Sequence, residues 1–209
     1  NAGLVVASGR TLLIDTLMSV PLTRDMLDAF AREVDGGDAI DTVVNTHANP
    51  DHFFGNGLVA DAQIIATQAT QEEMAGFNPR MLADLSSSYK QMGDSGEFLY
   101  ETMGRKFDFS GVDEVPLPNR VFEKSLSLAV GDKVVQLIDL GPAHTVSDTI
   151  VWVPGDRVVF TGDLLFNEGH PIMWAGPIEN WIAACEYIIG LDPLVVVPGH
   201  GPITDIQAV

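Results

Sequence analysis

The stretch of sequence that decides the fold is Thr46-His47-Ala48-Asn49-Pro50-Asp51-His52. It follows Thr42-Val43-Val44-Asn45, a short apolar run that predicts a buried strand. Two histidines and one aspartate therefore lie in one loop at the end of a strand, where a rigid scaffold holds functional side chains in place. This loop predicts a binding or catalytic site, and the rest of the sequence supplies residues of the same chemical kind.

The other histidines also lie in loops, and these loops contain glycine or proline. They are Gly141-Pro142-Ala143-His144-Thr145, Glu168-Gly169-His170-Pro171 and Pro198-Gly199-His200-Gly201. An aspartate lies in a similar setting, Phe160-Thr161-Gly162-Asp163. Glycine and proline let the backbone turn sharply and hold the neighbouring side chain in a fixed direction. We therefore expect several loops to deliver polar groups to one place.

Imidazole nitrogens and carboxylate oxygens form a donor set that suits zinc, iron or manganese. Taken alone, each histidine is better explained as a surface or capping residue. Taken together, their shared loop context favours a metal site with one or two ions. A water bound between two such ions ionises near neutral pH and becomes a nucleophile, and the ions polarise a carbonyl or phosphoryl oxygen.

These motifs, in this order, resemble the signature of the metallo-β-lactamase superfamily: a His-x-His-x-Asp-His loop after a strand, then a His, a Gly-Asp and a late Gly-His. The resemblance covers nearly the whole chain, including the strand end Leu13-Ile14-Asp15-Thr16. It implies an α/β (α+β) fold, a four-layer αβ/βα sandwich with the metals at one edge between two sheets. It also implies ligand roles, with a first site of His47 and His144, a second site of Asp51, His52 and His200, and Asp163 as the bridge.

Asn49 departs from this pattern, because it stands where the family usually has the second histidine of the loop. An amide oxygen is a poorer ligand than imidazole for a borderline metal. We expect the first site to bind metal more weakly than the second, or to take a harder metal. Three outcomes stay open: a two-metal site with Asn49 as a weak ligand, a one-metal enzyme that uses the second site, and a protein without turnover.

The periodicity along the chain predicts strands and helices in alternation, as in a layered α/β domain over 1–209. Three strand pairs are predicted: Leu4–Ala7 with Leu12–Ile14, Leu126–Val130 with Lys133–Leu140, and Thr149–Val153 with Val158–Thr161. Further strands are expected at Gln63–Ala66 and Leu194–Val197, and helices at Pro21–Val34, capped by Thr23, and Glu179–Leu191. A helical insertion rich in methionine is expected at about 68–110, where most apolar residues serve packing and the alternative is a roof over the active site.

A few residues near these loops carry smaller expectations. Asp15 either accepts a hydrogen bond from a metal-binding histidine or is a polar strand end. His170 is a candidate proton donor, with a structural role as the alternative. Ser147-Asp148 is expected to form a turn or cap. The remaining expectations are that Met173 and Trp174 line an apolar pocket mouth, that Trp181 belongs to the core, and that Cys185 is a buried, unreactive thiol.

Composition limits the partners. Lys plus Arg is 11 against 29 Asp plus Glu, a formal charge of −18. Nucleic acid and anionic membranes would be repelled by this charge, so neither is an expected partner. The single cysteine excludes an internal disulfide. No apolar run reaches the ~20 residues of a transmembrane helix, and Asn1-Ala2-Gly3 lacks a signal-peptide pattern. We expect a cytoplasmic protein, with a signal removed earlier as the alternative.

The expected function is hydrolysis of a small-molecule ester, lactone, thioester or amide by a metal-bound hydroxide, with Asp51 as ligand and positioner of the water. The expected cofactor is a divalent metal, zinc first, as one or two ions, with iron or manganese as alternatives. An iron-dependent redox enzyme of the same fold and a metal-binding protein without turnover are the competing hypotheses. Nothing outside the metal loops specifies a β-lactam.

Overall fold

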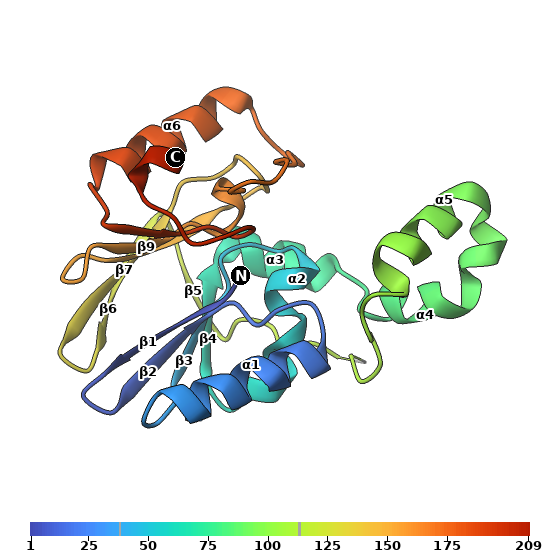
Figure 1. Cartoon of the computed structure of the whole chain (residues 1–209), viewed down its shortest axis with the longest axis horizontal. Helices are drawn as coiled ribbons and strands as arrows, with labels where there is room; N and C mark the ends of the chain where they lie inside the picture. The colour runs from blue at the N-terminus through green and yellow to red at the C-terminus, as the bar shows by residue number, and fades with distance from the viewer. Residues whose placement is uncertain (38, 113) are drawn as a thin grey trace.

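The computed structural model, which describes residues 1–37, 39–112 and 114–209, contains two five-stranded sheets that lie face to face (Figure 1). The first sheet has the strand order β1-β2-β3-β4-β5. Strands β1 and β2 are an antiparallel hairpin, and β2, β3, β4 and β5 run parallel. The bounds are Gly3–Ala7, Arg10–Ile14, Thr42–Val44, Gln63–Thr67 and Arg120–Phe122.

The second sheet has the strand order β10-β9-β8-β7-β6. Strands β6, β7, β8 and β9 pair antiparallel in succession, whereas β10 runs parallel to β9. The bounds are Ser125–Val130, Lys133–Asp139, Thr149–Val153, Val158–Phe160 and Val195–Val197. Because β9 and β10 are parallel, their carboxyl ends reach the same edge of this sheet. The loop before β8 also reaches that edge, since β8 is antiparallel to β9.

Apolar side chains fill the space between the two sheets. Leu12, Ile14 and Val44 of the first sheet meet Leu137 and Val151 of the second, and all five are almost fully buried. The alternation of inward and outward residues along each strand supplies this layer. Burial of this apolar layer holds the two sheets against each other.

A helix covers the outer face of each sheet. Helix α1, Val20–Glu33, packs Met26, Leu27 and Phe30 against the first sheet. Helix α6, Ile178–Gly190, packs Trp181 and Ile188 against the second. The order helix, sheet, sheet, helix is the four-layer sandwich that the sequence resemblance implies, so this expectation is confirmed (Figure 1).

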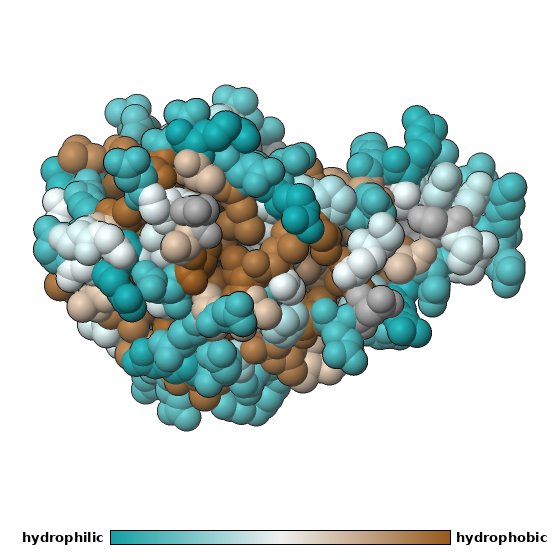
Figure 2. Space-filling model, turned by 90° about the horizontal axis from the view of Figure 1, so that it is seen from below, coloured by the Kyte–Doolittle hydropathy of each residue, from teal (hydrophilic) through white to brown (hydrophobic). Residues whose placement is uncertain are grey.

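The segment between β4 and β5 is helical, as predicted. It contains α3 and α4, a 3-10 turn η2, α5 and a π-helical turn η3, bounded by Gln68–Gly76, Arg80–Ser88, Tyr89–Met92, Gly93–Leu99 and Tyr100–Gly104. Figure 1 shows α4 and α5 projecting away from the two sheets. On the face drawn in Figure 2, hydrophobic residues gather between the sheets and these projecting helices. Met74 and Met103 pack into an apolar cluster with Phe53, whereas Met81 and Phe98 are exposed.

The remaining helical elements are short. They are α2, Pro50–Phe53, and the 3-10 turns η1, η4 and η5 at Phe54–Val59, Gly162–Leu164 and Ile206–Ala208. Among the described residues, none of the helices is long and apolar enough to cross a membrane.

The three predicted strand pairs and the two long helices are confirmed to within a few residues. The predicted cap of α1 is wrong: Ser19, not Thr23, accepts the hydrogen bond from the Leu22 backbone N–H. Thr23 is buried inside the helix, where its hydroxyl donates to the Ser19 carbonyl at 2.9 Å. Strand β5 is not predicted, because three residues are too few to form a periodic pattern.

Candidate metal centre

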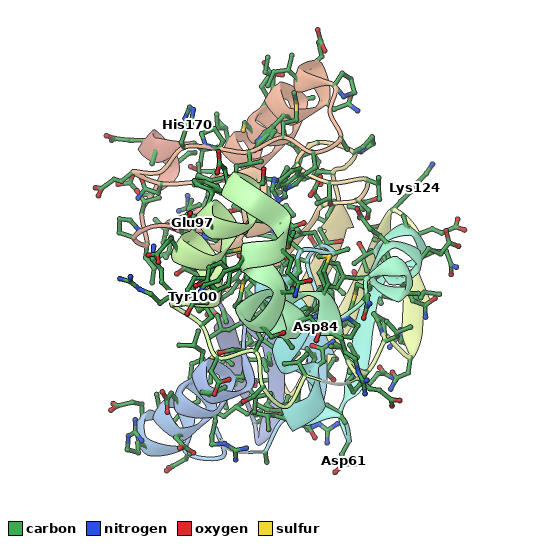
Figure 3. The ribbon with its side chains drawn as sticks, turned by 90° about the vertical axis from the view of Figure 1, so that its right-hand side faces the viewer. Asp61, Asp84, Glu97, Tyr100, Lys124 and His170 are labelled. Carbon is green, nitrogen blue, oxygen red and sulfur yellow. The ribbon has the colours of Figure 1, made fainter. Side chains whose placement is uncertain are left out.

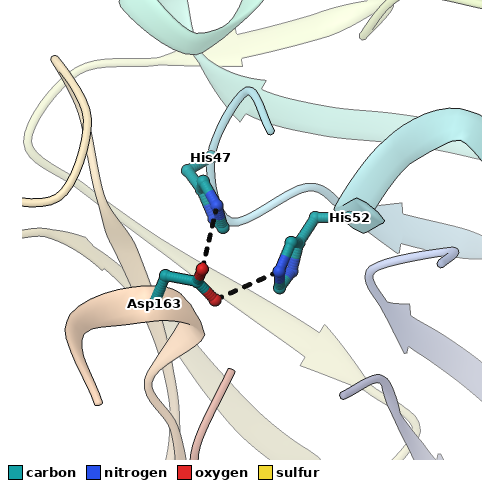
Figure 4. A group of neighbouring side chains, drawn as sticks. All are labelled: His47, His52 and Asp163. Atoms are coloured by element: carbon teal, nitrogen blue, oxygen red, sulfur yellow. Dashed lines mark ion pairs between the residues drawn. The ribbon is translucent and has the colours of Figure 1, made fainter. Parts of the chain in front are cut away.

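Four connecting segments bring the candidate site residues to one edge of the sandwich. His47 follows β3 of the first sheet, while Asp51 and His52 lie in α2. His144 lies between β7 and β8, Asp163 lies in η4 after β9, and His200 follows β10. Figure 4 shows His47 and His52 facing Asp163.

Asp163 is the centre of this group. Its Oδ1 lies 3.1 Å from Nε2 of His52, and its Oδ2 lies 3.2 Å from Nε2 of His200. The Nε2 atoms of His144 and His47 lie 3.4 and 3.8 Å from the same Oδ2. One buried carboxylate thus faces four imidazoles, as a bridging ligand would.

Asp51 forms the second half of the group. Its Oδ2 lies 3.4 Å from Nε2 of His52 and 3.2 Å from Nε2 of His200. Two sets of ligand atoms lie close enough to surround an ion: His47 with His52 and Asp163, and Asp51 with His52 and His200. Within each set the atoms are within 4.8 Å of one another. Both sets contain His52, which stands between them.

Three polar atoms of this group are buried without a hydrogen-bond partner among the described residues: Nε2 of His47, Nε2 of His52 and Oδ1 of Asp163. A buried polar atom without a partner costs free energy, so such atoms are uncommon and mark a missing ligand or a functional role. Two imidazole nitrogens and one carboxylate oxygen are ligands for zinc, iron or manganese. The residues present therefore fit a divalent metal ion.

Asp15 holds the ring of His52 in place, as one of the two interpretations of the sequence proposes. It is buried at the end of β2, and its Oδ2 accepts a hydrogen bond from Nδ1 of His52 at 2.7 Å. The backbone N–H and the hydroxyl of Thr46 also donate to Asp15, each at 2.8 Å. In the neutral ring, the proton on Nδ1 is held by Asp15, so the lone pair that a metal ligand needs is on Nε2.

His144 is fixed in the same way by a backbone carbonyl. Its Nδ1 donates to the carbonyl of Ile172 at 2.6 Å. Its Nε2, which faces Asp163, accepts a hydrogen bond from Nδ2 of Asn49 at 2.8 Å. Asn49 thus points into the site, where the sequence interpretation places it, and contacts His144 there.

Burial and the contacts among the site residues shift their pKa values. Burial and the neighbouring His52 hold the pKa of His47 well below its usual value. Burial also opposes the charged form of His52, but Asp51, Asp163 and Asp15 outweigh it and raise the pKa of His52. Burial raises the pKa of Asp51 and Asp163, yet the facing histidines lower both pKa values below the usual range. These carboxylates are therefore ionised and available to a cation.

The site opens to solvent on the side of Asp51 and His200. Their side chains are 28% and 42% exposed, whereas those of His47, His52, His144 and Asp163 are nearly covered. Hydrogen bonds to Asp163 and Asp51 raise the pKa of His200 to about 9. The cluster is therefore accessible to solvent from this side.

His170 does not join the group in the contacts that the structure describes. It is exposed on the loop between η4 and α6, and Figure 3 shows it at the periphery of the molecule. Its role as a proton donor stays a prediction. Trp181 is buried, and its Nε1 donates to the Leu164 carbonyl, which confirms it as a core residue. Cys185 is half-buried in α6, and burial raises the pKa of its thiol, in keeping with an unreactive residue.

Ser147-Asp148 forms the predicted cap of the His144 loop. Asp148 accepts hydrogen bonds from the backbone N–H groups of Ala143 and Thr145, which flank His144. Sequence reasoning missed the supporting role of Gly199, which lies against Asp163 and leaves no room for a side chain. The Gly-His pair was the signal for it. The hydrogen bond from His144 to the Ile172 carbonyl could not be predicted either. Every residue has a backbone carbonyl, and the sequence does not show which one meets the ring.

Comparison with known proteins agrees with this geometry. Residues 1–200 match the family model of the metallo-β-lactamase superfamily, so the chain belongs to this superfamily. A curated relative, the β-lactamase-like protein 2 homolog of Caenorhabditis elegans, is 26% identical over 83 residues. That match covers 40% of this chain and 27% of the relative, so the chain aligns with about a quarter of the relative's length.

Solved structures share the fold. The metallo-β-lactamase from Pontibacter korlensis superposes with a TM-score of 0.67 at 18% identity, over 98% of this chain and 81% of that one. The metallo-β-lactamase DIM-1, solved after exposure to ceftazidime, gives a TM-score of 0.66 at 20% identity, over 98% and 78%. At this level of identity the likeness concerns the fold, and function has to be argued from the site.

Proposed function

We propose that the chain is a metal-dependent hydrolase that cleaves an ester, lactone, thioester or amide of a small molecule. The observation that carries the proposal is the trio of buried ligand atoms on His47, His52 and Asp163, which face one another and have no hydrogen-bond partner among the described residues. Membership of a superfamily whose solved relatives include metallo-β-lactamases supports hydrolysis as the reaction class.

His47, His52, His144, Asp51, Asp163 and His200 would hold one or two divalent ions, zinc first. Asn49 would add a weak ligand only by giving up its hydrogen bond to His144. Such an ion lowers the pKa of a coordinated water and polarises a substrate carbonyl. Asp51 lies at the open side of the site, where its partly exposed carboxylate can orient a water molecule toward the substrate. Asp15 and the Ile172 carbonyl hold two imidazole rings in place, so no reorganisation is needed when substrate arrives.

The partner that we propose is a small molecule. The formal charge of −18 opposes nucleic acids and anionic membranes. Aqueous access at Asp51 and His200 suits a substrate that approaches from solution.

An assay with metal-loaded protein tests this function. We expect hydrolysis of at least one of four substrate classes, namely aryl esters, lactones, thioesters and amides, and loss of that activity in Asp163→Asn. Circular dichroism would establish that the variant is folded. A protein that retains its metal and cleaves none of the four classes would contradict the proposal.

Iron-dependent redox chemistry is a second candidate, which the donor set itself favours. His47, His52 and Asp163 are two histidines and one carboxylate, a combination that binds iron in oxygenases. Elemental analysis of protein produced without added metal separates the candidates. Zinc or manganese supports the hydrolase, whereas iron that reacts with oxygen supports the redox enzyme.

A further inference from the structure

The loop between η4 and α6 is attached at both of its ends to histidines of the metal centre. At its start, the ring of Phe166 stacks on that of His200 with 4.9 Å between centroids and 14° between planes. The backbone N–H of Asn167 donates to the carbonyl of His200 at 2.9 Å. This end of the loop therefore lies on the side of the site that is open to solvent.

The far end of the loop is attached to His144. The backbone N–H groups of Trp174 and Ala175 donate to the carbonyl of His144 at 2.8 and 3.2 Å. The imidazole of His144 donates in return to the Ile172 carbonyl at 2.6 Å. The chain from 168 to 175 therefore spans the rim of the site from one histidine to another, and its position is fixed by backbone contacts.

Residues 168–175 are all exposed, and three consecutive ones are large and apolar: Ile172, Met173 and Trp174. We call these three residues the apolar lip. The side chain of Trp174 is the most exposed of the three, with 67% of its surface accessible, whereas Trp152 and Trp181 are buried in the core. Adjacent exposed apolar side chains are unfavourable in water and commonly mark a binding surface.

We propose that the apolar lip binds the hydrocarbon or aromatic part of the substrate while the substrate's carbonyl lies against the His/Asp cluster. This inference rests on the proposed hydrolase function and names the substrate class: an ester or related compound with an apolar acyl group. Because the backbone of the lip is hydrogen-bonded to His144, the lip lies beside the metal centre. The charge of −18 disfavours a second copy of this chain as the occupant.

The discriminating measurement is the ratio of kcat/KM for p-nitrophenyl octanoate to that for p-nitrophenyl acetate. We expect the metal-loaded wild type to prefer the octanoate ester. Trp174→Ala should lower the ratio about tenfold, since loss of apolar contact typically costs that much discrimination. Trp174→Phe, which retains an apolar ring, should lower it less. Val134→Ala removes an exposed apolar residue on β7 and should leave the ratio unchanged.

A binding measurement separates failure of the lip from failure of the hydrolase function. If the wild type cleaves neither these esters nor the other three substrate classes, the proposed function fails, and titration with sodium octanoate then tests the lip alone. Octanoate should change the tryptophan fluorescence of the wild type, and sodium acetate should not, with the change lost in Trp174→Phe. Equal responses to both carboxylates would overturn the inference. A dimer that dissociates in Trp174→Ala, seen by light scattering, would also overturn it.

Discussion

Nδ2 of Asn49 donates a hydrogen bond to Nε2 of His144 over 2.8 Å. The other nitrogen of the same ring donates to the Ile172 carbonyl, so Nε2 carries the lone pair that accepts from Asn49. A metal ion bound by His144 would need this same lone pair. Asn49 and a first-site metal therefore compete for His144, which gives the unusual residue of the loop a testable consequence.

Replacement of Asn49 by histidine should raise the metal content of the protein. The new imidazole would remove the competing donor and add a ligand beside His47 and His144. We expect Asn49→His to retain about one more zinc ion per chain than the wild type after dialysis, measured by elemental analysis.

Asn49→Ala is the matched control for this change, because it removes the hydrogen bond without adding a ligand. Its zinc content should lie between those of the wild type and Asn49→His, because the competing donor is gone but no ligand is added. Loss of metal in both variants would mean that Asn49 itself holds an ion through its amide oxygen, and competition for His144 would then be the wrong explanation.

Asp15 should control metal affinity without contacting the metal. Asp15→Asn removes the charge that accepts from Nδ1 of His52, so this ring becomes a weaker and less ordered ligand. We expect a loss of zinc affinity of about ten- to a hundredfold, measured by chelator competition.

Asp41, the residue before β3, is a structural control for Asp15. Asp41 accepts hydrogen bonds from the backbone and hydroxyl of Thr11, away from the metal centre. Asp41→Asn should lower thermal stability and leave zinc affinity as it is. Equal zinc affinities for Asp15→Asn and the wild type would show that the Asp15 contact with His52 does not tune the metal.

Much of this site is predictable from sequence, because its residues come from short loops at strand ends. Strands β3, β9 and β10 are apolar runs, and the residues after them are the polar ones, so the convergence of His47, Asp163 and His200 follows from topology. The capping role of Ser147-Asp148 is likewise readable from residue type.

Other features depend on contacts between distant segments and leave no mark in the sequence. The pairing of Asn49 with His144 joins two loops of different sheets. The pattern in 68–110 predicts helices, but periodicity does not say which apolar residues find a partner, and Phe98 proves to be exposed. The start of α1 was misplaced because both Ser19 and Thr23 are competent caps, and the path of the chain decides between them.

Gly199 should tolerate no side chain. A Cβ atom at this position would lie 2.0 Å from Oδ1 of Asp163 and 2.6 Å from the carbonyl carbon of Gly162. Because its φ lies outside the left-handed region, lack of space alone opposes alanine here. We expect Gly199→Ala to displace Asp163, to lose metal, and to lower the free energy of unfolding by about 1–3 kcal/mol.

Gly155 offers the comparison, since a Cβ there would meet nothing within 4 Å. Gly155→Ala should keep both its metal content and its melting temperature. If Gly199→Ala also bound metal like the wild type, the close approach of the 199 backbone to Asp163 would have no functional importance.

Asp148 should make stability depend on pH. Burial raises its pKa to about 7 from an ordinary value of 3.8, against the opposing effect of hydrogen bonds from Thr145 and Ala143, and Asp139 raises it further. The folded state therefore binds this proton more tightly than the unfolded state does. The contribution of Asp148 to stability is fully present below about pH 4 and is lost as the pH rises toward 7.

Asp148→Asn has no proton to lose at this position, so its stability relative to the wild type should rise across the same window. We expect the difference in free energy of unfolding to shift toward the variant by on the order of 3 kcal/mol between pH 4 and 8, measured by urea denaturation of the metal-free proteins. Comparison of the two proteins at each pH cancels the titration of the histidines, which they share. A difference that stays constant with pH would mean that Asp148 is ionised throughout, because the donors of the His144 loop outweigh its burial.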